Sequence, residues 1–255
     1  MCIRDRHSGD STAVIPPYSV NEEMLKEVEE KSKKLALGLN VKGLLNIQFA
    51  IKDEELFILE ANPRASRTMP FVAKVTGNQI IKAGTLLMLG YSIDEVRNKT
   101  KYLSSSSNKV AIKKAIFPWS RFPAEDTMLG PEMKATGEVL GVGKEFGTAL
   151  NKAYAAAGVE INNKEKGIFV TLSDSEKPNF IQTVNKYLEL GFTLYSTEGT
   201  GKFLKTNGID SLMVGKADDL GQTSLTIIED KLVSLVINTP TYANELSDGW
   251  KIRRL

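Results

Sequence analysis

Two neighbouring segments in which apolar and polar residues alternate constrain the fold of this 255-residue chain more than any other feature. The first is LLNIQFAI, residues 44–51, and the second is LFILEAN, residues 56–62. Successive side chains of a β-strand point to opposite faces, so each segment predicts a strand with one apolar and one polar face. The polar KDEE between them predicts a β-hairpin with residues 53–55 as a three-residue loop.

The register of this hairpin decides which side chains lie opposite one another. A three-residue loop sets Gln48 opposite Glu60 and Asn46 opposite Asn62 on one face. On the other, wholly apolar face it pairs Ile51 with Phe57, Phe49 with Leu59 and Ile47 with Ala61. A shift of one residue would send both sets to the wrong faces, so the pattern itself specifies the pairing.

The polar face of the hairpin is a candidate metal site. Gln48, Glu60 and Asn62 offer oxygen atoms, which suit a hard cation, and Mg²⁺ usually takes one or two carboxylates together with phosphate oxygens. Arg64 and Arg67 follow the second strand, where planar guanidinium groups would stabilise charge on a phosphoryl group in transfer. The alternative is a sheet face that is only solvated. Polar groups gathered from two strands favour the site.

Strands and helices alternate from residue 167 to residue 239. The segments GIFVTL, FTLYST, GIDSLMVG and KLVSLVINT predict four strands with helical segments between them. This order predicts a small doubly wound parallel sheet, a fold that binds ligands at the carboxyl ends of its strands. Lys177, Lys216 and Asn238 fall near these ends, although surface lysines are more often only solvated.

A glycine-rich turn follows the second of these strands. Thr197, Gly199, Thr200 and Gly201 resemble an anion-binding turn at a helix N-terminus, where free N–H groups meet a phosphate. A P-loop is excluded, because neither Ser nor Thr follows the Gly-Lys pair. A strand-to-helix connection with an N-cap threonine explains the same residues, and the spacing leaves both interpretations open.

The rest of the chain is predicted to form helices, one strand and loops. Residues 21–39 predict an amphipathic surface helix, residues 63–102 are mainly helical in pattern, and VAIKKAIF predicts a strand. Residues 131–158 predict a loop followed by an Ala-rich helix, and residues 158–166 predict the main linker. HSGDS, residues 7–11, either touches a nucleotide or forms only a turn.

Composition limits the classes of partner. The 33 basic and 31 acidic residues give a formal net charge of +2, which is too small for the basic stripe of a nucleic-acid-binding protein or a membrane-surface patch. We therefore expect small molecules or proteins as partners, and neither nucleic acid nor a membrane. The single cysteine, Cys2, excludes an intrachain disulfide and suits a reducing compartment, so we expect a cytoplasmic protein.

Four segments together resemble the large subunit of carbamoyl phosphate synthetase: HSGDSTAVIPPYS, GLLNIQFA, EANPRASRTMPFVAKVTG and GPEMKATGEVLGVG. The similarity extends over nearly everything after residue 6. It implies a partial ATP-grasp domain, which is α+β with an antiparallel sheet portion, followed by a doubly wound parallel-sheet domain like methylglyoxal synthase, truncated at both ends. The implied divisions are an artefactual leader at 1–6, the C-terminal part of the ATP-grasp domain at 7–102, the rest of the carbamoyl phosphate synthetic unit and a connection at 103–158, and an incomplete allosteric domain at 159–255.

The resemblance implies a ligase that phosphorylates carbamate to carbamoyl phosphate with ATP and Mg²⁺ or Mn²⁺, for pyrimidine and arginine biosynthesis. The family's functional residues fall on metal ligands at Gln48, Glu60 and Asn62, ATP contacts at His7, Ser8, Gln48 and Glu60, and catalytic side chains at Glu60, Arg64 and Arg67.

The same resemblance implies an allosteric site in the second domain for a nucleoside monophosphate, UMP or IMP. The residues expected around its phosphate are Lys177, Thr197, Thr200, Lys216, Asn238 and Thr239. It also implies a glutaminase small subunit as partner and an oligomer in the complete enzyme.

The sequence departs from the family pattern in two respects. The long ATP-grasp segment that precedes HSGDS in the family is absent, so we expect the chain alone to lack synthetase activity. Lys114 stands where some bacterial relatives carry a glutamate associated with ornithine binding, which argues against activation by ornithine. Two alternatives stay open: a regulatory nucleotide-binding module without catalysis, and another ATP-grasp ligase, against which the GPEM segment and the second domain argue.

Overall fold

The computed structural model describes residues 7–101, 109–122, 127, 129–159, 165–217, 219–239 and 251–252. The expected leader at residues 1–6 and the centre of the expected linker, residues 160–164, lie outside the described residues. Contacts divide the chain into unit 1, which comprises Met1–Phe117 and Leu129–Val159, and unit 2, which comprises Pro118–Met128 and Glu160–Leu255. Among the described helices, none combines the length and apolarity needed to cross a membrane.

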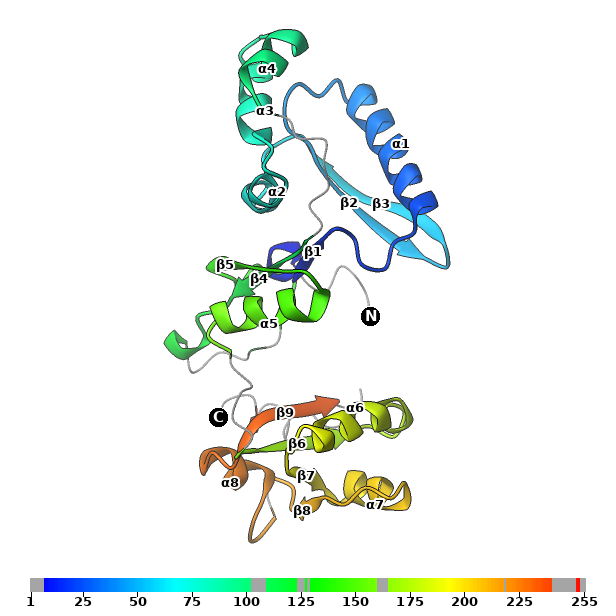
Figure 1. Ribbon diagram of the computed structural model, residues 1–255, viewed down its shortest axis with the longest axis vertical. Helices are drawn as coiled ribbons and strands as arrows, with labels where there is room; N and C mark the ends of the chain where they lie inside the picture. The colour runs from blue at the N-terminus through cyan, green and yellow to red at the C-terminus, as the bar shows by residue number, and fades with distance from the viewer. Residues whose placement is uncertain are drawn as a thin grey trace. The chain divides into compact units, whose positions relative to one another are not determined.

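Unit 1 is α+β with antiparallel strands (Figure 1). Its elements are a 3-10 helix η2 (Ser8–Asp10), strands β1 (Ala13–Ile15), β2 (Asn46–Lys52), β3 (Glu55–Asn62), β4 (Val110–Ile116) and β5 (Gly137–Gly143), and helices α1 (Glu22–Gly38), α2 (Thr68–Thr76), α3 (Ile80–Met88), α4 (Ile93–Lys99) and α5 (Phe146–Ala156). β2 pairs with β3, and β4 pairs with both β1 and β5. The antiparallel portion of the predicted fold is therefore confirmed.

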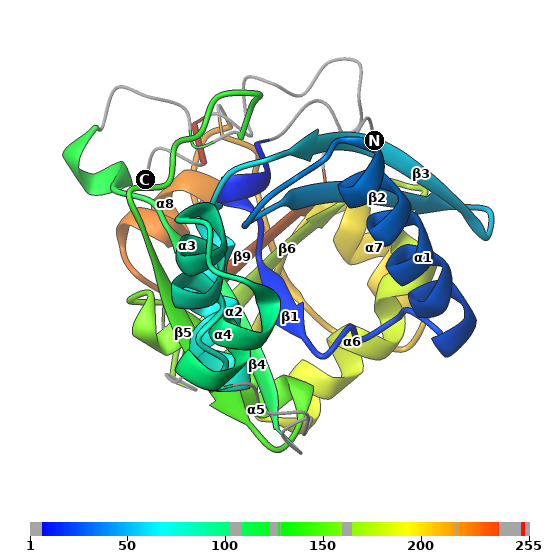
Figure 2. The ribbon, with the colours of Figure 1, turned by 90° about the horizontal axis from the view of Figure 1, so that it is seen from above.

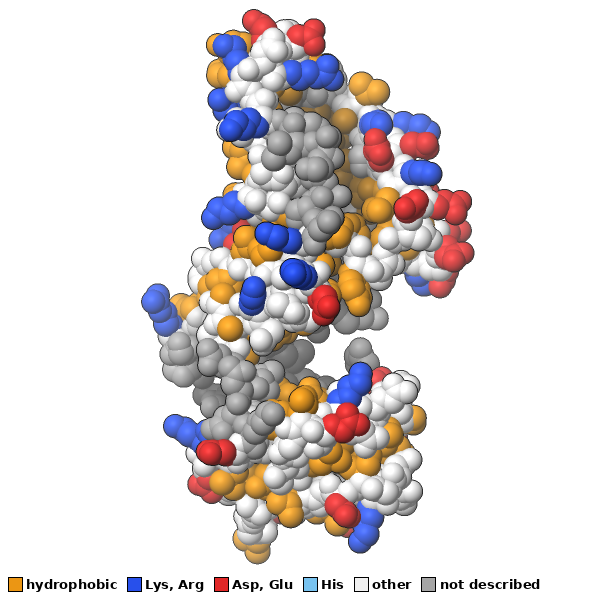
Figure 3. All heavy atoms as spheres, viewed as in Figure 1, with side chains coloured by type: hydrophobic (Ala, Val, Ile, Leu, Met, Phe, Trp, Pro, Cys, Tyr) orange, Lys and Arg blue, Asp and Glu red, His pale blue; other side chains and the backbone are white. Residues whose placement is uncertain are grey.

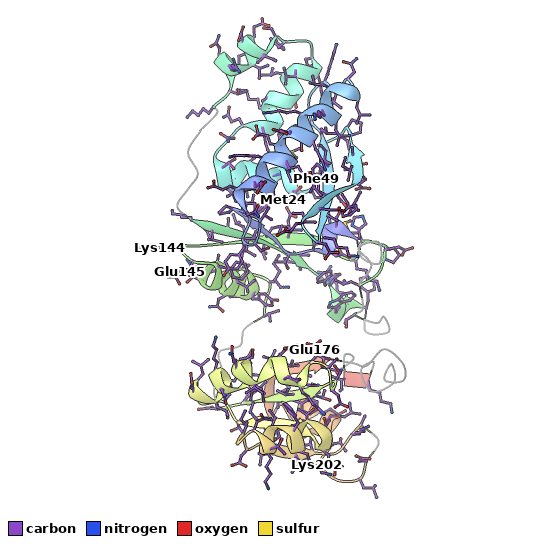
Figure 4. All side chains as sticks on the ribbon, turned by 90° about the vertical axis from the view of Figure 1, so that its right-hand side faces the viewer. Met24, Phe49, Lys144, Glu145, Glu176 and Lys202 are labelled. Atoms are coloured by element: carbon purple, nitrogen blue, oxygen red, sulfur yellow. The ribbon has the colours of Figure 1, made fainter. Side chains whose placement is uncertain are left out.

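Helix α1 covers one face of the β2–β3 hairpin. It begins where predicted, because the side chain of Asn21 accepts a hydrogen bond from Met24 N at 2.8 Å and caps the helix. Figures 1 and 2 both show α1 running along β2 and β3, and Figure 4 labels Met24 on α1 and Phe49 on β2. Figure 3 shows acidic and basic side chains interspersed along the outer side of this helix. Among them, Lys31 pairs with Glu27, four residues earlier, at 2.6 Å.

The hairpin register is confirmed at the open end and wrong near the loop. Gln48 pairs with Glu60 and Asn46 pairs with Asn62, as predicted. Beyond Gln48 a bulge shifts the register, so that the pairs become Phe49 with Ile58, Ala50 with Phe57, Ile51 with Leu56 and Lys52 with Glu55. The loop is a two-residue turn in which Asp53 and Glu54 both have left-handed φ angles, 51° and 62°. A turn of this kind matches the right-handed twist of the strands, whereas a three-residue loop does not fit this pairing.

The bulge also changes which side chains face α1, and the predicted apolar face is wrong in its outer half. Leu56 is buried, with 8% of its surface exposed, and its carbonyl oxygen accepts a hydrogen bond from Lys31 Nζ at 3.2 Å. Ile58 lies in a groove lined by α1 residues. Phe57, expected on this face, pairs instead with Ala50 on the face that carries Gln48, and it is 44% exposed.

The sheet β1–β4–β5 packs against α5, and β5 is a strand that the sequence did not predict. The segment GEVLGVG was expected to form a loop, because glycine weakens a strand. The glycines have a packing role: a Cβ at Gly141 would overlap the carbonyl oxygen of Ala149 and lie 2.5 Å from Ala153 N. Ala149 and Ala153 are fully buried beside Ile112, so helix and strand are in backbone contact.

Unit 2 is a four-stranded parallel sheet with helices on both faces (Figure 1). Its elements are a 3-10 helix η3 (Trp119–Arg121), strands β6 (Gly167–Leu172), β7 (Leu194–Thr197), β8 (Leu212–Val214) and β9 (Val233–Thr239), and helices α6 (Lys177–Glu189), α7 (Glu198–Thr206) and α8 (Ser224–Glu229). The strand order is β8-β7-β6-β9. This arrangement confirms the predicted doubly wound sheet.

Alternate residues of the central strand β6 enter two separate cores. Ile168 and Val170 pack with Val184 of α6 and Leu204 of α7 on one face. Phe169, between them in sequence, packs on the other face with Ile227 of α8. All residues of the GIFVTL run except the partly buried Thr171 are buried, which is typical of a strand covered on both faces. Because the strands are parallel, their carboxyl ends meet at one edge of the sheet.

Candidate functional site

The predicted metal ligands share one open face of the hairpin. Gln48 and Glu60 are directly paired, and Asn62 Nδ2 donates a hydrogen bond to Glu60 Oε1 at 2.9 Å. Glu60 is exposed to solvent. One carboxylate and two amides therefore lie side by side because the register and the strand periodicity put them there. Among the described residues no cluster of three or more His, Cys, Asp or Glu side chains could hold a metal ion.

Arg64 and Arg67 lie in different surroundings. Arg64 N donates to Asn62 O at 2.8 Å, and its guanidinium group donates to the neighbouring Ala65 O at 3.1 Å. Arg67 Nη1 reaches a distant segment, where it contacts Met133 Sδ at 3.1 Å and Ala135 O at 3.4 Å. The structure thus links Arg67 to the GPEM segment and leaves Arg64 within its own turn.

His7 and Ser8 lie at the start of η2, and this turn contacts the same distant segment. His7 Nδ1 accepts a hydrogen bond from Gly9 N at 3.0 Å, so a neutral His7 carries its proton on Nε2. Asp10 is buried, and its carboxylate accepts from Lys134 N at 2.9 Å and from Ala135 N at 2.8 Å. Residues 133–135 therefore bridge the HSGD turn and Arg67.

Lys113 is a buried cation in this neighbourhood that sequence reasoning missed. Only 2% of its surface is exposed, and its Nζ donates to Gly9 O at 3.4 Å. Burial lowers the pKa of Lys113, whereas the nearby negative charge of Glu138 acts in the opposite direction. Lys113 lies in the middle of an apolar strand pattern, and a lysine at such a position was the signal that could have revealed it.

Unit 2 contains a cavity of about 610 Å³ at the carboxyl edge of its sheet. All the residues predicted around a nucleotide phosphate line it: Lys177, Thr197, Thr200, Lys216, Asn238 and Thr239. Lys177 begins α6, Thr197 ends β7, and Asn238 and Thr239 are the last two residues of β9. The ends of the four strands and the starts of α6, α7 and α8 thus bring together side chains that are far apart in sequence. The cavity volume lies in the range of small-molecule sites.

Two of the pocket threonines also hold the end of β6. Thr200 Oγ1 accepts a hydrogen bond from Leu172 N at 3.0 Å and is nearly fully buried. Thr239 Oγ1 accepts from Ser173 N at 2.8 Å. Each hydroxyl keeps a proton to donate, so these residues can hold the sheet edge and meet a ligand at once.

The N-terminus of α7 opens into the cavity. Thr197 stands at the N-cap position, but its side chain does not cap the helix; Thr197 Oγ1 contacts Thr171 Oγ1 at 3.2 Å instead. Glu198 and Gly199, the first two helical residues, line the cavity. Lys177 Nζ lies 3.9 Å from the position that a Cβ on Gly199 would occupy. A cation and the positive end of a helix therefore face the same space, which favours an anion there.

Two acidic residues also line the cavity: Asp219, and Glu198 at the start of α7. Asp219 Oδ2 accepts a hydrogen bond from Lys216 N at 2.7 Å, and Glu198 pairs with Lys202 at 2.6 Å. The hydrogen bond from Lys202 lowers the pKa of Glu198. An anionic ligand would thus be drawn towards Lys177 and α7, and a hydroxyl or N–H group would be accepted near Asp219.

Comparisons with known proteins find two families in the two halves of the chain. The model for the carbamoyl-phosphate synthase L chain, ATP binding domain, matches residues 1–96, and the model for the MGS-like domain matches residues 179–255. A carbamoyl phosphate synthase large chain, C-terminal section, from Aquifex aeolicus is 41% identical over 262 residues, which cover 97% of this chain and 48% of the relative.

Two further relatives are also carbamoyl phosphate synthase large chains or sections of one. The C-terminal section from Methanocaldococcus jannaschii is 41% identical over 256 residues, covering 97% of this chain and 41% of that protein. The carbamoyl phosphate synthase large chain of Brucella melitensis biotype 1 is 41% identical over 250 residues, covering 97% of this chain and 21% of that protein. The chain thus spans about half the length of the Aquifex relative and a smaller share of the others.

Proposed function

Because the chain belongs to the carbamoyl phosphate synthase large-chain family, we propose that it forms part of an enzyme that uses ATP to phosphorylate carbamate, and that the unit 2 cavity binds a regulatory nucleotide. The observation that supports the catalytic part is the pairing of Gln48 with Glu60 on the polar face of the hairpin, with Asn62 beside them. The regulatory part is supported by the six predicted residues that line one cavity.

In the proposed reaction a carbamate oxygen attacks the γ-phosphorus of ATP. The bond from that phosphorus to the β–γ bridging oxygen breaks, and ADP leaves with the electron pair, giving carbamoyl phosphate. Such transfers need positioning and charge stabilisation more than covalent help. Arg64 and Arg67 are assigned to the charge on the reacting phosphoryl group, and His7, through its Nε2–H, and Ser8 are assigned to the nucleotide.

Gln48, Glu60 and Asn62 are the residues that would hold Mg²⁺ or Mn²⁺. Their chemistry fits, because amide and carboxylate oxygens suit such a cation, and the contact of Asn62 with Glu60 already brings the two groups together. When bound, the metal would neutralise negative charge on the terminal phosphates.

A metal titration tests the hairpin site. We expect Mn²⁺ to bind this chain, as measured by electron paramagnetic resonance, and Glu60→Gln to weaken binding about tenfold or more. Glu55→Gln, which removes the same charge at the closed end of the hairpin, is the matched control and leaves binding unchanged. Equal affinity of wild type and Glu60→Gln would contradict the site.

Calorimetric titration with UMP and IMP tests the cavity. We expect one of the two to bind the wild-type chain, and Lys177→Met to weaken it, with the exposed Lys186→Met on the same helix as control. The observed cavity also favours a second function, a regulatory nucleotide-binding module without catalysis. In that case the nucleotide binds, but Glu60→Gln in the complete enzyme leaves carbamoyl phosphate formation intact.

We further propose that carbamoyl phosphate formation needs more of the protein than these 255 residues, since they span 48% of the Aquifex relative. A glutaminase subunit would then supply ammonia, and the product would serve pyrimidine and arginine synthesis. Magnesium-dependent formation of carbamoyl phosphate by this chain alone, in a coupled assay, would refute the requirement.

A further inference from the structure

Lys177, one of the lysines that line the unit 2 cavity, already has an anion of its own. Lys177 Nζ lies 2.5 Å from Asp174 Oδ1. The two partners differ in burial: 13% of the Lys177 side chain is exposed, against 95% of the Asp174 side chain. The lysine is therefore held in the cavity wall, whereas the carboxylate projects into solvent and is free to move away.

Asp174 is placed to compete for Lys177 with any anion that binds at the α7 N-terminus. Lys177 Nζ lies close both to this carboxylate and to Gly199, where the helix N-terminus opens into the cavity. A phosphate that approached both the helix and Lys177 would share the same ammonium group with the negative charge of Asp174. Two anions on one cation repel each other, so the ligand must loosen or displace the carboxylate.

We propose that Asp174 is an internal counter-anion that competes with the phosphate of the ligand for Lys177 and so lowers the affinity of the cavity for nucleotides. This inference rests on the proposed function, namely that the cavity binds a nucleoside monophosphate. Asp174 makes no contact with the ligand in this scheme; it acts through Lys177. The site is thereby tuned to fill at a higher nucleotide concentration than its cationic groups alone would allow.

The geometry makes Asp174→Asn a direct test. The asparagine keeps the shape and can still accept a hydrogen bond from Lys177, but it removes the competing charge. Exposed ion pairs are worth little, so the expected gain in UMP or IMP affinity is about two- to fivefold. Asp210→Asn is the matched control, because this exposed residue precedes β8 at the opposite edge of the sheet.

The same comparison with uridine or inosine separates charge competition from a change of shape. These nucleosides have no phosphate, so Asp174→Asn leaves their affinity unchanged. In the Lys177→Met background the effect of Asp174→Asn on the nucleotide shrinks, because the two residues act as one unit, and a double-mutant cycle measures this coupling. Calorimetry at an ionic strength of about 0.05 M keeps charge effects visible.

The outcomes distinguish this inference from the function beneath it. Tighter binding of the nucleotide by Asp174→Asn, lost in the Lys177→Met background, supports competition. Unchanged or weaker nucleotide binding by Asp174→Asn refutes it and leaves the nucleotide site standing. If neither UMP nor IMP binds the wild-type chain, the proposed site fails and the competition fails with it. Thermal melting of each variant establishes that the fold is retained.

Discussion

In the hairpin of unit 1 the predicted ligand residues project from a sheet face into solvent, whereas in unit 2 they line a cavity and also hold the sheet together. Glu60 is exposed, and its carboxylate accepts a hydrogen bond from the neighbouring amide of Asn62. Thr200 is buried and fixes the end of β6. The difference follows from topology: an antiparallel pair presents side chains along its faces, whereas parallel strands bring their ends together at one edge. A substitution of a ligand residue in the hairpin should therefore change binding without changing stability, whereas a substitution of a buried cavity residue such as Thr200 should change both.

The largest expected effect comes from destabilising unit 1 and measuring whether unit 2 keeps its protection from hydrogen exchange. Gly141→Val would drive a side chain into the carbonyl oxygen of Ala149, and because a backbone cannot move as a side chain can, we expect a loss of about 3 kcal/mol or more in unit 1. Hydrogen exchange, followed by mass spectrometry, should show faster exchange in β4, β5 and α5 and unchanged exchange in β6 to β9. Gly137→Val on the same strand has open space around it and serves as control. Equal loss of protection in both units would break the comparison.

A second test compares one ligand residue from each region. Thr200→Val keeps the shape but leaves the buried Leu172 N without its acceptor, so we expect unit 2 to lose about 1–3 kcal/mol in its free energy of unfolding, and Thr200→Ser to restore it. Glu60→Ala should change the stability of unit 1 by no more than about 0.5 kcal/mol, as expected of an exposed side chain. Denaturant titrations measure both. If Glu60→Ala instead lowers the free energy of unfolding of unit 1 by well over about 0.5 kcal/mol, Glu60 contributes to stability and the contrast between the two regions is wrong.

The hairpin turn offers a change of opposite sign. Glu54 has a φ of 62°, a conformation that glycine adopts without strain, so Glu54→Gly is expected to stabilise unit 1 by roughly 1 kcal/mol. Glu55→Gly, one residue further along, enters the strand and should destabilise it instead. If both variants lose stability, the two-residue turn is not the preferred loop of this hairpin.

The smallest expected effect concerns the buried lysine of unit 1. Burial lowers the pKa of Lys113 in the folded protein below the ordinary lysine value of 10.5, so as pH rises towards 10.5 the folded state releases its proton before the unfolded state does. The unfolded chain then binds more protons, and stability contributed at this residue rises with pH. Relative to Lys113→Met, the wild-type protein should therefore gain stability as pH rises from neutral towards 10.5. A constant difference across that range would contradict a lowered pKa.

Sequence patterns predicted the elements with strong periodicity and missed those defined by close approach. Gln48 and Glu60 could be paired because alternation fixes the face of a residue, but alternation carries no sign of a bulge at Leu59 or of a tight turn without glycine. β5 was missed because its glycines weaken a strand in isolation, and only α5 shows why they are there. Contacts such as that of Lys113 with Gly9, 104 residues apart, have no local pattern at all.

The junction of β7 and α7 sets the direction in which the cavity can yield. Strand β7 ends at Thr197 and the helix begins at Glu198, with no loop between them. This side of the cavity wall therefore continues directly from the sheet, without a loop that could act as a hinge. On the other side, residues 173–176 separate β6 from α6, and they carry Asp174. A bound effector would therefore contact a rigid wall on the β7–α7 side. Any movement that its binding causes would occur in residues 173–176 and at the start of α6.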